Sequence, residues 1–88
     1  MILMIWKVYI LYSERFKKTY VGCSADTHQR LLTHNSGKVV STKKFRPWRI
    51  IFEEATENYI NARGREKYYK SGAGRRKMKI IFDELGIR

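Results

Sequence analysis

Glu66 is the residue of this 88-residue chain whose type and surroundings point most directly to chemistry. It is the only acid in the segment 58–82. If that segment is helical, the carboxylate shares one stripe with three largely apolar positions, Tyr59, Ala62 and Tyr69. A buried carboxylate is costly unless it is paired. Glu66 therefore either forms a structural ion pair with a nearby Arg or Lys, or binds a divalent cation such as Mg²⁺, which accepts one or two carboxylates together with water and phosphate.

Arg30 and His34 are four residues apart, so on a helix they share one face. A guanidinium can hold a phosphate through two hydrogen bonds and can stabilise charge that grows on phosphorus. An imidazole can transfer a proton near neutral pH or contact a phosphate. The competing interpretation places both side chains on a solvated helix face with no part in chemistry.

Tyr9 and Tyr20 lie on two segments that we expect to pair as strands. A phenol has a pKa of about 10, so it acts as a general base at neutral pH only where nearby cations favour phenolate. The net charge of +11, together with a bound metal, would supply such surroundings. Otherwise the two tyrosines are core aromatics with a solvated hydroxyl.

Basic residues are clustered as well as abundant. Lys38–Arg49 holds five basic residues and no acid, and Arg63–Lys79 holds eight basic residues and one acid. Clustered cations favour nucleic acid as the partner, because phosphate binding by Lys and Arg releases counterions. A solvated surface without a partner and an anionic membrane surface are weaker alternatives. The predicted nucleic-acid contacts are Lys43, Lys44, Arg46, Arg63, Lys67, Lys70, Arg75 and Arg76.

Composition excludes several classes of protein. A length of 88 residues predicts one domain over residues 1–88, and 43% hydrophobic and 14% aromatic residues exclude a disordered basic tail. The single cysteine, Cys23, excludes an intrachain disulfide framework and is interpreted as a small buried or half-buried residue. The apolar run Met1–Trp6 is too short for a membrane span and lacks the features of a secretory signal. We therefore expect a soluble, cytoplasmic, monomeric protein.

Three segments read as strands: Ile5–Tyr12, Lys18–Cys23 and Trp48–Glu53. The first two flank a polar turn and predict a hairpin. Gly22 lacks a side chain, which lets a ligand or backbone come close. In the third segment, alternation places Trp48, Ile50 and Phe52 on one face.

Three helices are expected around these strands. Asp26 is the predicted N-cap of the first, with Leu31 and Leu32 as its buried stripe and Gly37 as its left-handed end. A basic loop, Lys38–Arg46, follows. Asn58 caps the second helix, which reaches about Lys70; Ser71–Gly74 breaks it, and Arg75–Leu85 forms the third. The order β-β-α-β-α-α predicts an α/β (α+β) fold in which helices flank a small, mainly antiparallel sheet in two packed layers.

Together these segments resemble the GIY-YIG endonuclease family over nearly the whole chain, in the small standalone bacterial form related to the excision-repair nuclease domain. Val8–Leu11 resembles the first half-motif and Tyr20–Gly22 the second. Arg30–Gly37 resembles the R-x-x-x-H-N-x-G run, and Ala62–Gly72 resembles the second-helix signature with Glu66 in the metal-ligand position. Two departures are Lys7 in place of the glycine of the first half-motif and Arg75–Met78 where the excision-repair domain carries an asparagine.

The resemblance implies phosphodiester hydrolysis with one Mg²⁺ or Mn²⁺. Tyr20, aided by Tyr9, would activate water, and Glu66 would hold the metal. Arg30 would stabilise the pentavalent transition state, and His34 would move a proton or hold the phosphate. The implied substrate is DNA, or alternatively RNA, in a setting such as DNA repair or recombination.

Two other functions compete with the nuclease. One is a non-catalytic DNA- or RNA-binding module on the same scaffold, and the other is a basic protein that binds the ribosome or another nucleoprotein. A pure binder has no need to keep Tyr9, Tyr20, Arg30 and Glu66 together. We also expect a protein partner to supply specificity, because the homing and repair members of the family obtain it from extra domains.

Overall fold

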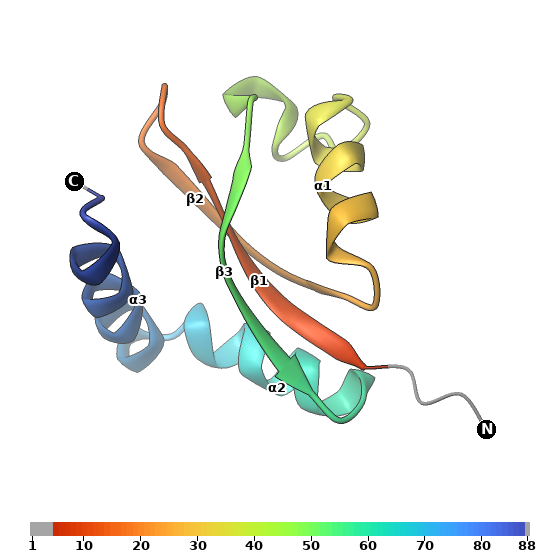
Figure 1. Cartoon of the computed structure of the whole chain (residues 1–88), viewed down its shortest axis with the longest axis vertical. Coiled ribbons are helices and arrows are strands. Elements are labelled where there is room, and N and C mark those ends of the chain that lie inside the picture. The colour runs from red at the N-terminus through yellow and green to blue at the C-terminus, as the bar shows by residue number, and fades with distance from the viewer. Residues whose placement is uncertain (1–4, 88) are drawn as a thin grey trace.

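The computed structural model describes residues 5–87, so Arg88 and most of the apolar run Met1–Trp6 lie outside the described residues. Three strands form one antiparallel sheet in the order β2-β1-β3 (Figure 1). The elements in chain order are β1 (Trp6–Ser13), β2 (Lys18–Ser24), α1 (Thr27–Asn35), the short 3₁₀ helix η1 (Lys43–Phe45), β3 (Arg49–Thr56), α2 (Tyr59–Tyr69) and α3 (Gly72–Leu85). The predicted order and mixed α/β architecture are confirmed.

The strands β1 and β2 form the expected hairpin. In its register Tyr9 lies opposite Gly22, and Leu11 lies opposite Tyr20. The strand β2 is at one edge of the sheet, so one side of it has no neighbouring strand. This edge is where side chains from both faces of the sheet can meet.

The strand β3 is longer than predicted and is not regular. It begins at Arg49 and ends at Thr56, because Glu53 and Glu54 stay in the strand as ion-pair partners of Lys7 and Arg65. Its register against β1 shifts beside Ile10 and Leu11, which leaves Ile51 as an extra residue. The predicted common face of Trp48, Ile50 and Phe52 is therefore wrong: Ile50 packs beside Trp48, while Phe52 packs on the other face.

Helices cover both faces of the sheet, so the molecule has three layers and the expected two-layer packing is wrong (Figure 1). On the side of α1 and η1, the buried residues are Tyr9, Leu11 and Trp48. The residues buried on the side of α2 and α3 are Val8, Ile10, Val21, Ala62, Tyr69, Met78 and Ile81. The alternation of β1 supplies both clusters, since successive strand residues point to opposite faces.

Helix α1 begins as predicted but buries a different side chain. The Asp26 carboxylate accepts a hydrogen bond from the backbone N–H of Gln29 at 3.0 Å, and Gly37 is left-handed at φ +86°. Leu32, however, is 64% exposed, and Leu31 is only half-buried. The fully buried position of the last turn is His34. The expected buried stripe of leucines is therefore wrong.

The helices α2 and α3 are separated by less chain than predicted. Asn58 caps α2 as expected, and α3 starts at Gly72 rather than Arg75, because the Ser71 hydroxyl caps it through the N–H of Gly74 at 3.2 Å. A Cβ on Gly74 would lie 1.9 Å from the Tyr68 carbonyl oxygen. The glycine thus lets α3 start against the last turn of α2 rather than breaking the chain.

Within residues 5–87, no helix combines the length and the hydropathy required to cross a lipid bilayer.

Candidate active site

Four of the predicted catalytic side chains surround one pocket of about 200 Å³. Tyr9 and Tyr20 reach it from β1 and β2, Arg30 reaches it from α1, and Glu66 reaches it from α2. The pocket lies at the β2 edge of the sheet, and its lining includes residues of α1 from one face and of α2 from the other. Its remaining lining residues are Gly22, Cys23, Tyr59 and Arg63.

Gly22 keeps the pocket open above Tyr9. A Cβ at this position would lie 2.6 Å from the Tyr9 hydroxyl oxygen and 3.0 Å from the Tyr20 ring. Any larger residue would therefore displace the phenol. The sequence predicted that a backbone or a ligand comes close at this glycine, whereas the atoms that do so belong to the Tyr9 and Tyr20 side chains.

The Tyr9 hydroxyl is held in its protonated form. Burial, followed by the proximity of Tyr20, raises the pKa of Tyr9 to about 12, although interactions with Arg30 oppose the shift. Its oxygen lies 3.0 Å from Nε2 of His34. With a proton to give and an imidazole nitrogen beside it, Tyr9 is placed to orient groups in the pocket rather than to remove a proton from water.

His34 lies behind Tyr9 and does not line the pocket. Its Nδ1 is 2.9 Å from the Thr42 hydroxyl, which itself donates to the Val39 carbonyl at 3.4 Å. The Thr42 oxygen therefore accepts from Nδ1–H, and Nε2 accepts from the Tyr9 hydroxyl. Burial and the nearby Arg30 guanidinium lower the pKa of His34, which favours this neutral form.

The buried placement of His34 changes two expectations. The alternative of a solvated helix face is wrong for this residue, whose side chain is fully buried. Direct contact with a phosphate is equally excluded in this arrangement, because Tyr9 stands between the imidazole and the pocket. The geometry makes His34 a positioning residue for Tyr9.

Glu66 is buried and ion-paired. Its Oε1 accepts from Arg63 Nη1 at 3.0 Å, and its Oε2 accepts from Lys70 Nζ at 2.7 Å. Burial alone would raise the pKa of Glu66, but hydrogen bonds from Lys70 and Cys23 outweigh it and lower the pKa. The carboxylate is therefore charged at neutral pH.

The donor set around Glu66 fits a hard divalent cation that takes most of its ligands from water and substrate. Among the described residues no three His, Cys, Asp or Glu side chains gather to hold a metal by themselves. Mg²⁺ is commonly bound through one or two carboxylates, with waters and phosphate oxygens completing its shell. Arg63 and Lys70 are each more than half exposed, at 56% and 53%, so both can turn away when a cation takes their place.

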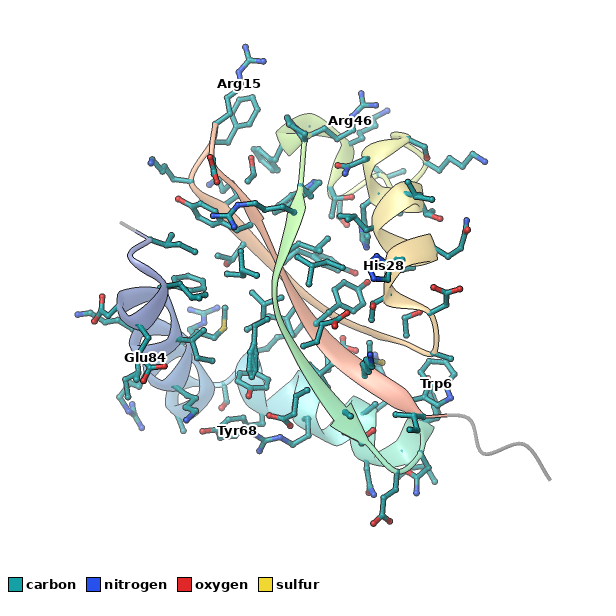
Figure 2. All side chains as sticks on the ribbon, in the orientation of Figure 1. Trp6, Arg15, His28, Arg46, Tyr68 and Glu84 are labelled. Carbon is teal, nitrogen blue, oxygen red and sulfur yellow. The ribbon has the colours of Figure 1, made fainter. Side chains whose placement is uncertain are left out.

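The predicted nucleic-acid contacts fall into two regions. Arg63, Lys67 and Lys70 lie on α2 beside the pocket, and Arg75 and Arg76 follow on α3. The other three, Lys43, Lys44 and Arg46, lie in and after η1, at the opposite end of the sheet (Figure 2).

Arg46 has a structural task besides its charge. Its guanidinium donates to the Lys43 carbonyl at 2.8 Å and to the Asn35 carbonyl at 3.5 Å, and it packs against Gly37. The segment predicted as a basic loop is therefore ordered by one of its own basic residues.

Two lining residues, Cys23 and Tyr59, were not predicted as part of the site. Burial and the hydrogen bond to Glu66 raise the pKa of the Cys23 thiol, so it donates to the carboxylate rather than acting as a nucleophile. Tyr59 was expected on a buried stripe but is 50% exposed at the start of α2. Sequence spacing could have indicated that Tyr59 belongs to the site. Arg63 follows it by four residues and Glu66 follows Arg63 by three, which places all three on one helix face.

Comparisons with known proteins identify the family of the chain. Residues 5–79 match the model of the GIY-YIG catalytic domain. The chain is 36% identical over 66 residues to the UPF0213 protein YazA of Bacillus subtilis (strain 168), a match covering 74% of this chain and 66% of that protein. It is 31% identical over 65 residues to the UPF0213 protein in the ldhD 5'region of Pediococcus acidilactici, a match covering 70% of this chain and 66% of that protein. The matches thus span slightly under two thirds of these relatives.

A solved structure shares the fold. The solution NMR structure of a UPF0213 protein from Bacillus halodurans superposes with a TM-score of 0.53 at 28% sequence identity. The superposition covers 89% of this chain and 83% of the other.

Proposed function

Because the chain belongs to the GIY-YIG family, a family of nuclease domains, we propose that it is a divalent-metal-dependent endonuclease that hydrolyses phosphodiester bonds of DNA. The observation that carries the proposal is the pocket at the β2 edge, where two phenols, a guanidinium and a carboxylate from four separate elements come together. A role in DNA repair or recombination is part of the same proposal.

The two tyrosines divide the work in this proposal. Tyr20 is the half-buried phenol that lines the pocket. In its phenolate form, which nearby cations favour, it accepts the proton of the attacking water and becomes the neutral phenol. Tyr9 keeps its own proton, since its pKa is raised to about 12, and its oxygen accepts a hydrogen bond from that water. His34 fixes the Tyr9 hydroxyl through the 3.0 Å contact.

In this proposal, Arg30 and a metal ion held by Glu66 stabilise the negative charge of the reacting phosphate. Arg30 donates to the non-bridging oxygens as negative charge grows on the phosphate. Glu66 would hold Mg²⁺ or Mn²⁺, which when bound neutralises the phosphate and stabilises the leaving oxygen. Arg63 and Lys70, which now bind the carboxylate, then become available to neighbouring phosphates.

Nicking of supercoiled plasmid tests the proposal. We expect cleavage with Mg²⁺ or Mn²⁺, no cleavage in excess chelator, and no cleavage by Glu66→Gln, which removes the charge of the metal ligand but keeps its size. DNA binding by Glu66→Gln should survive, because the surrounding cations remain. Glu84→Gln is the matched control, since it removes the same charge from an exposed position of α3 (Figure 2).

The result distinguishes a nuclease from a binding module on the same scaffold. If Glu66→Gln cleaves as well as the wild type, or if the wild type binds DNA but never cleaves it with either metal, the ion-paired Glu66 is structural and the nuclease proposal fails.

A further inference from the structure

A second, larger hollow adjoins the catalytic pocket. It is an open groove of about 650 Å³ between the β2 edge and helix α3. Tyr20 lines both the groove and the pocket, so the two lie next to each other at the β2 edge. The groove's lining residues are Thr19, Tyr20, Val21, Tyr69, Lys70, Arg75, Met78, Lys79 and Phe82.

The floor of the groove is apolar and partly aromatic. Val21 and Met78 are buried, while Phe82 is half-buried and keeps part of its ring accessible. The Tyr20 ring itself packs on the α1 side of the sheet, so Tyr20 only borders the groove. An aromatic floor of this kind suits a flat, weakly polar group such as a nucleobase, which can stack on a ring whatever its sequence.

The rim of the groove is cationic. Lys70, Arg75 and Lys79 are all exposed there. Within residues 5–87, neither Arg75 nor Lys79 has an acidic side chain at ion-pair distance. Lys70 lies 2.7 Å from Glu66, so the rim begins at the catalytic carboxylate. A cationic rim around an apolar floor, with Arg75 and Lys79 not engaged by a carboxylate, complements a chain with a phosphate between successive flat bases.

We propose that this groove binds an unpaired nucleotide next to the phosphodiester that is cut, with the base over Phe82 and its phosphates against Arg75 and Lys79. The inference rests on the proposed nuclease function and specifies its substrate as nucleic acid with a single-stranded segment beside the cleaved bond. A duplex keeps its bases stacked inside and would leave the apolar floor uncovered.

Abasic scanning tests this proposal. Binding of a fluorescently labelled single-stranded DNA oligonucleotide is measured by anisotropy in excess EDTA, and one nucleotide at a time is replaced by an abasic unit. We expect one or two neighbouring abasic positions to weaken wild-type binding by about ten-fold, the range seen when a base–aromatic stack is removed. Phe82→Leu, which keeps an apolar side chain but removes the ring, should weaken binding of the intact oligonucleotide similarly and abolish the abasic effect.

Two further measurements separate stacking from general charge. Phe82→Leu should leave affinity for a blunt duplex of the same sequence unchanged. The double variant with Arg75→Ala and Lys79→Ala should bind the intact and the abasic oligonucleotides more weakly than the wild type does, and by the same factor for both. Lys77→Ala, which removes one charge from α3 outside the groove, should preserve the abasic effect in full.

The proposal fails if every abasic oligonucleotide binds as tightly as the intact one, or if the abasic effect persists in Phe82→Leu. Competition by an acidic peptide of equal charge as effectively as by the oligonucleotide would also overturn it, since the groove would then bind a protein segment. Because no turnover is measured, these failures are distinct from a failure of the plasmid-nicking test.

Discussion

The two tyrosines of the pocket have opposite surroundings although they lie on paired strands. Tyr9 is buried on the α1 side with its hydroxyl against His34, whereas Tyr20 is half-buried at the exposed edge and lines both hollows. Desolvation favours the neutral phenol, which is why the pKa of Tyr9 is raised to about 12. Burial thus favours the neutral phenol at Tyr9, which leaves the less buried Tyr20 as the candidate base.

The buried His34 predicts a pH dependence of stability. Its pKa in the folded protein is lowered below 6.5 by burial, then by Arg30, so the unfolded chain binds a proton first as the pH falls. Near neutral pH the free energy of unfolding should therefore be level, and as the pH falls through 6.5 it should decrease, by at most about 1.4 kcal/mol per pH unit for one proton. Urea unfolding at a series of pH values above the carboxyl range measures this slope.

His34→Gln provides the comparison for that measurement. Glutamine retains a hydrogen-bond donor and an acceptor but does not titrate, so the decrease just below pH 6.5 should disappear. At lower pH both proteins should lose stability, because the pKa values of Glu54 and Glu66 are lowered in the folded state. An identical slope in the variant would show that His34 does not control this pH range.

Much of the element pattern was predictable because local chemistry determines it. Asp26 and Asn58 are short polar residues at helix starts, and both accept the expected backbone hydrogen bonds. The hairpin and its closely approached Gly22 follow from strand patterning and the absence of a Cβ. The convergence of the four pocket residues was implied by family resemblance, since nothing local brings them together.

The failures arise where tertiary packing outweighs local pattern. Leu32 is exposed because α1 turns the polar His34 inward, where Tyr9 and Thr42 satisfy both ring nitrogens. The bulge at Ile51 reverses the alternation of β3, and no residue type in the sequence marks it. Cys23 lines the pocket at the edge strand β2. It was not predicted there, because strand order is set by the assembled sheet and not by local sequence.

The close contact between α2 and α3 predicts that a larger residue at Gly74 lowers the stability of the fold. Gly74→Ala would place a Cβ 1.9 Å from the Tyr68 carbonyl oxygen and 2.4 Å from the Tyr69 Cα, so the backbone has to move. We expect a loss of about 1–3 kcal/mol in the free energy of unfolding, measured as a lower urea midpoint.

Gly64→Ala is the control within α2. A Cβ there meets nothing within 4 Å, so alanine should stabilise the protein by about 0.5–1 kcal/mol through its better helix propensity. Equal effects of the two substitutions would contradict the close contact between the helices.

At the scale of the whole molecule, the net charge of +11 should govern how the protein meets nucleic acid. The predicted nucleic-acid contacts lie in two regions, one on α2 and the start of α3 and the other in and after η1. A duplex that contacts about five phosphates should show a log–log dependence of affinity on salt with a slope of about −4.5. Titrations at several salt concentrations measure it, and a flat response would exclude the basic surface as the docking face.

The η1 cluster can be tested separately. Replacing Lys43 and Lys44 together by alanine should reduce that slope by about 1.8 if both contact phosphate. An unchanged slope would restrict the DNA footprint to the pocket end of the molecule. Arg46 is unsuitable for this test, because its guanidinium also supports the Asn35 and Lys43 carbonyls.

The most direct test of the account is the location of the metal. Addition of Mn²⁺ alone to ¹⁵N-labelled protein broadens the amide NMR signals of residues near the ion. We predict broadening centred on Gly22, Cys23, Arg30 and Glu66, which is lost in Glu66→Gln and retained in Glu84→Gln. Broadening centred elsewhere, such as on the acidic end of α3, or unchanged by Glu66→Gln, would contradict it.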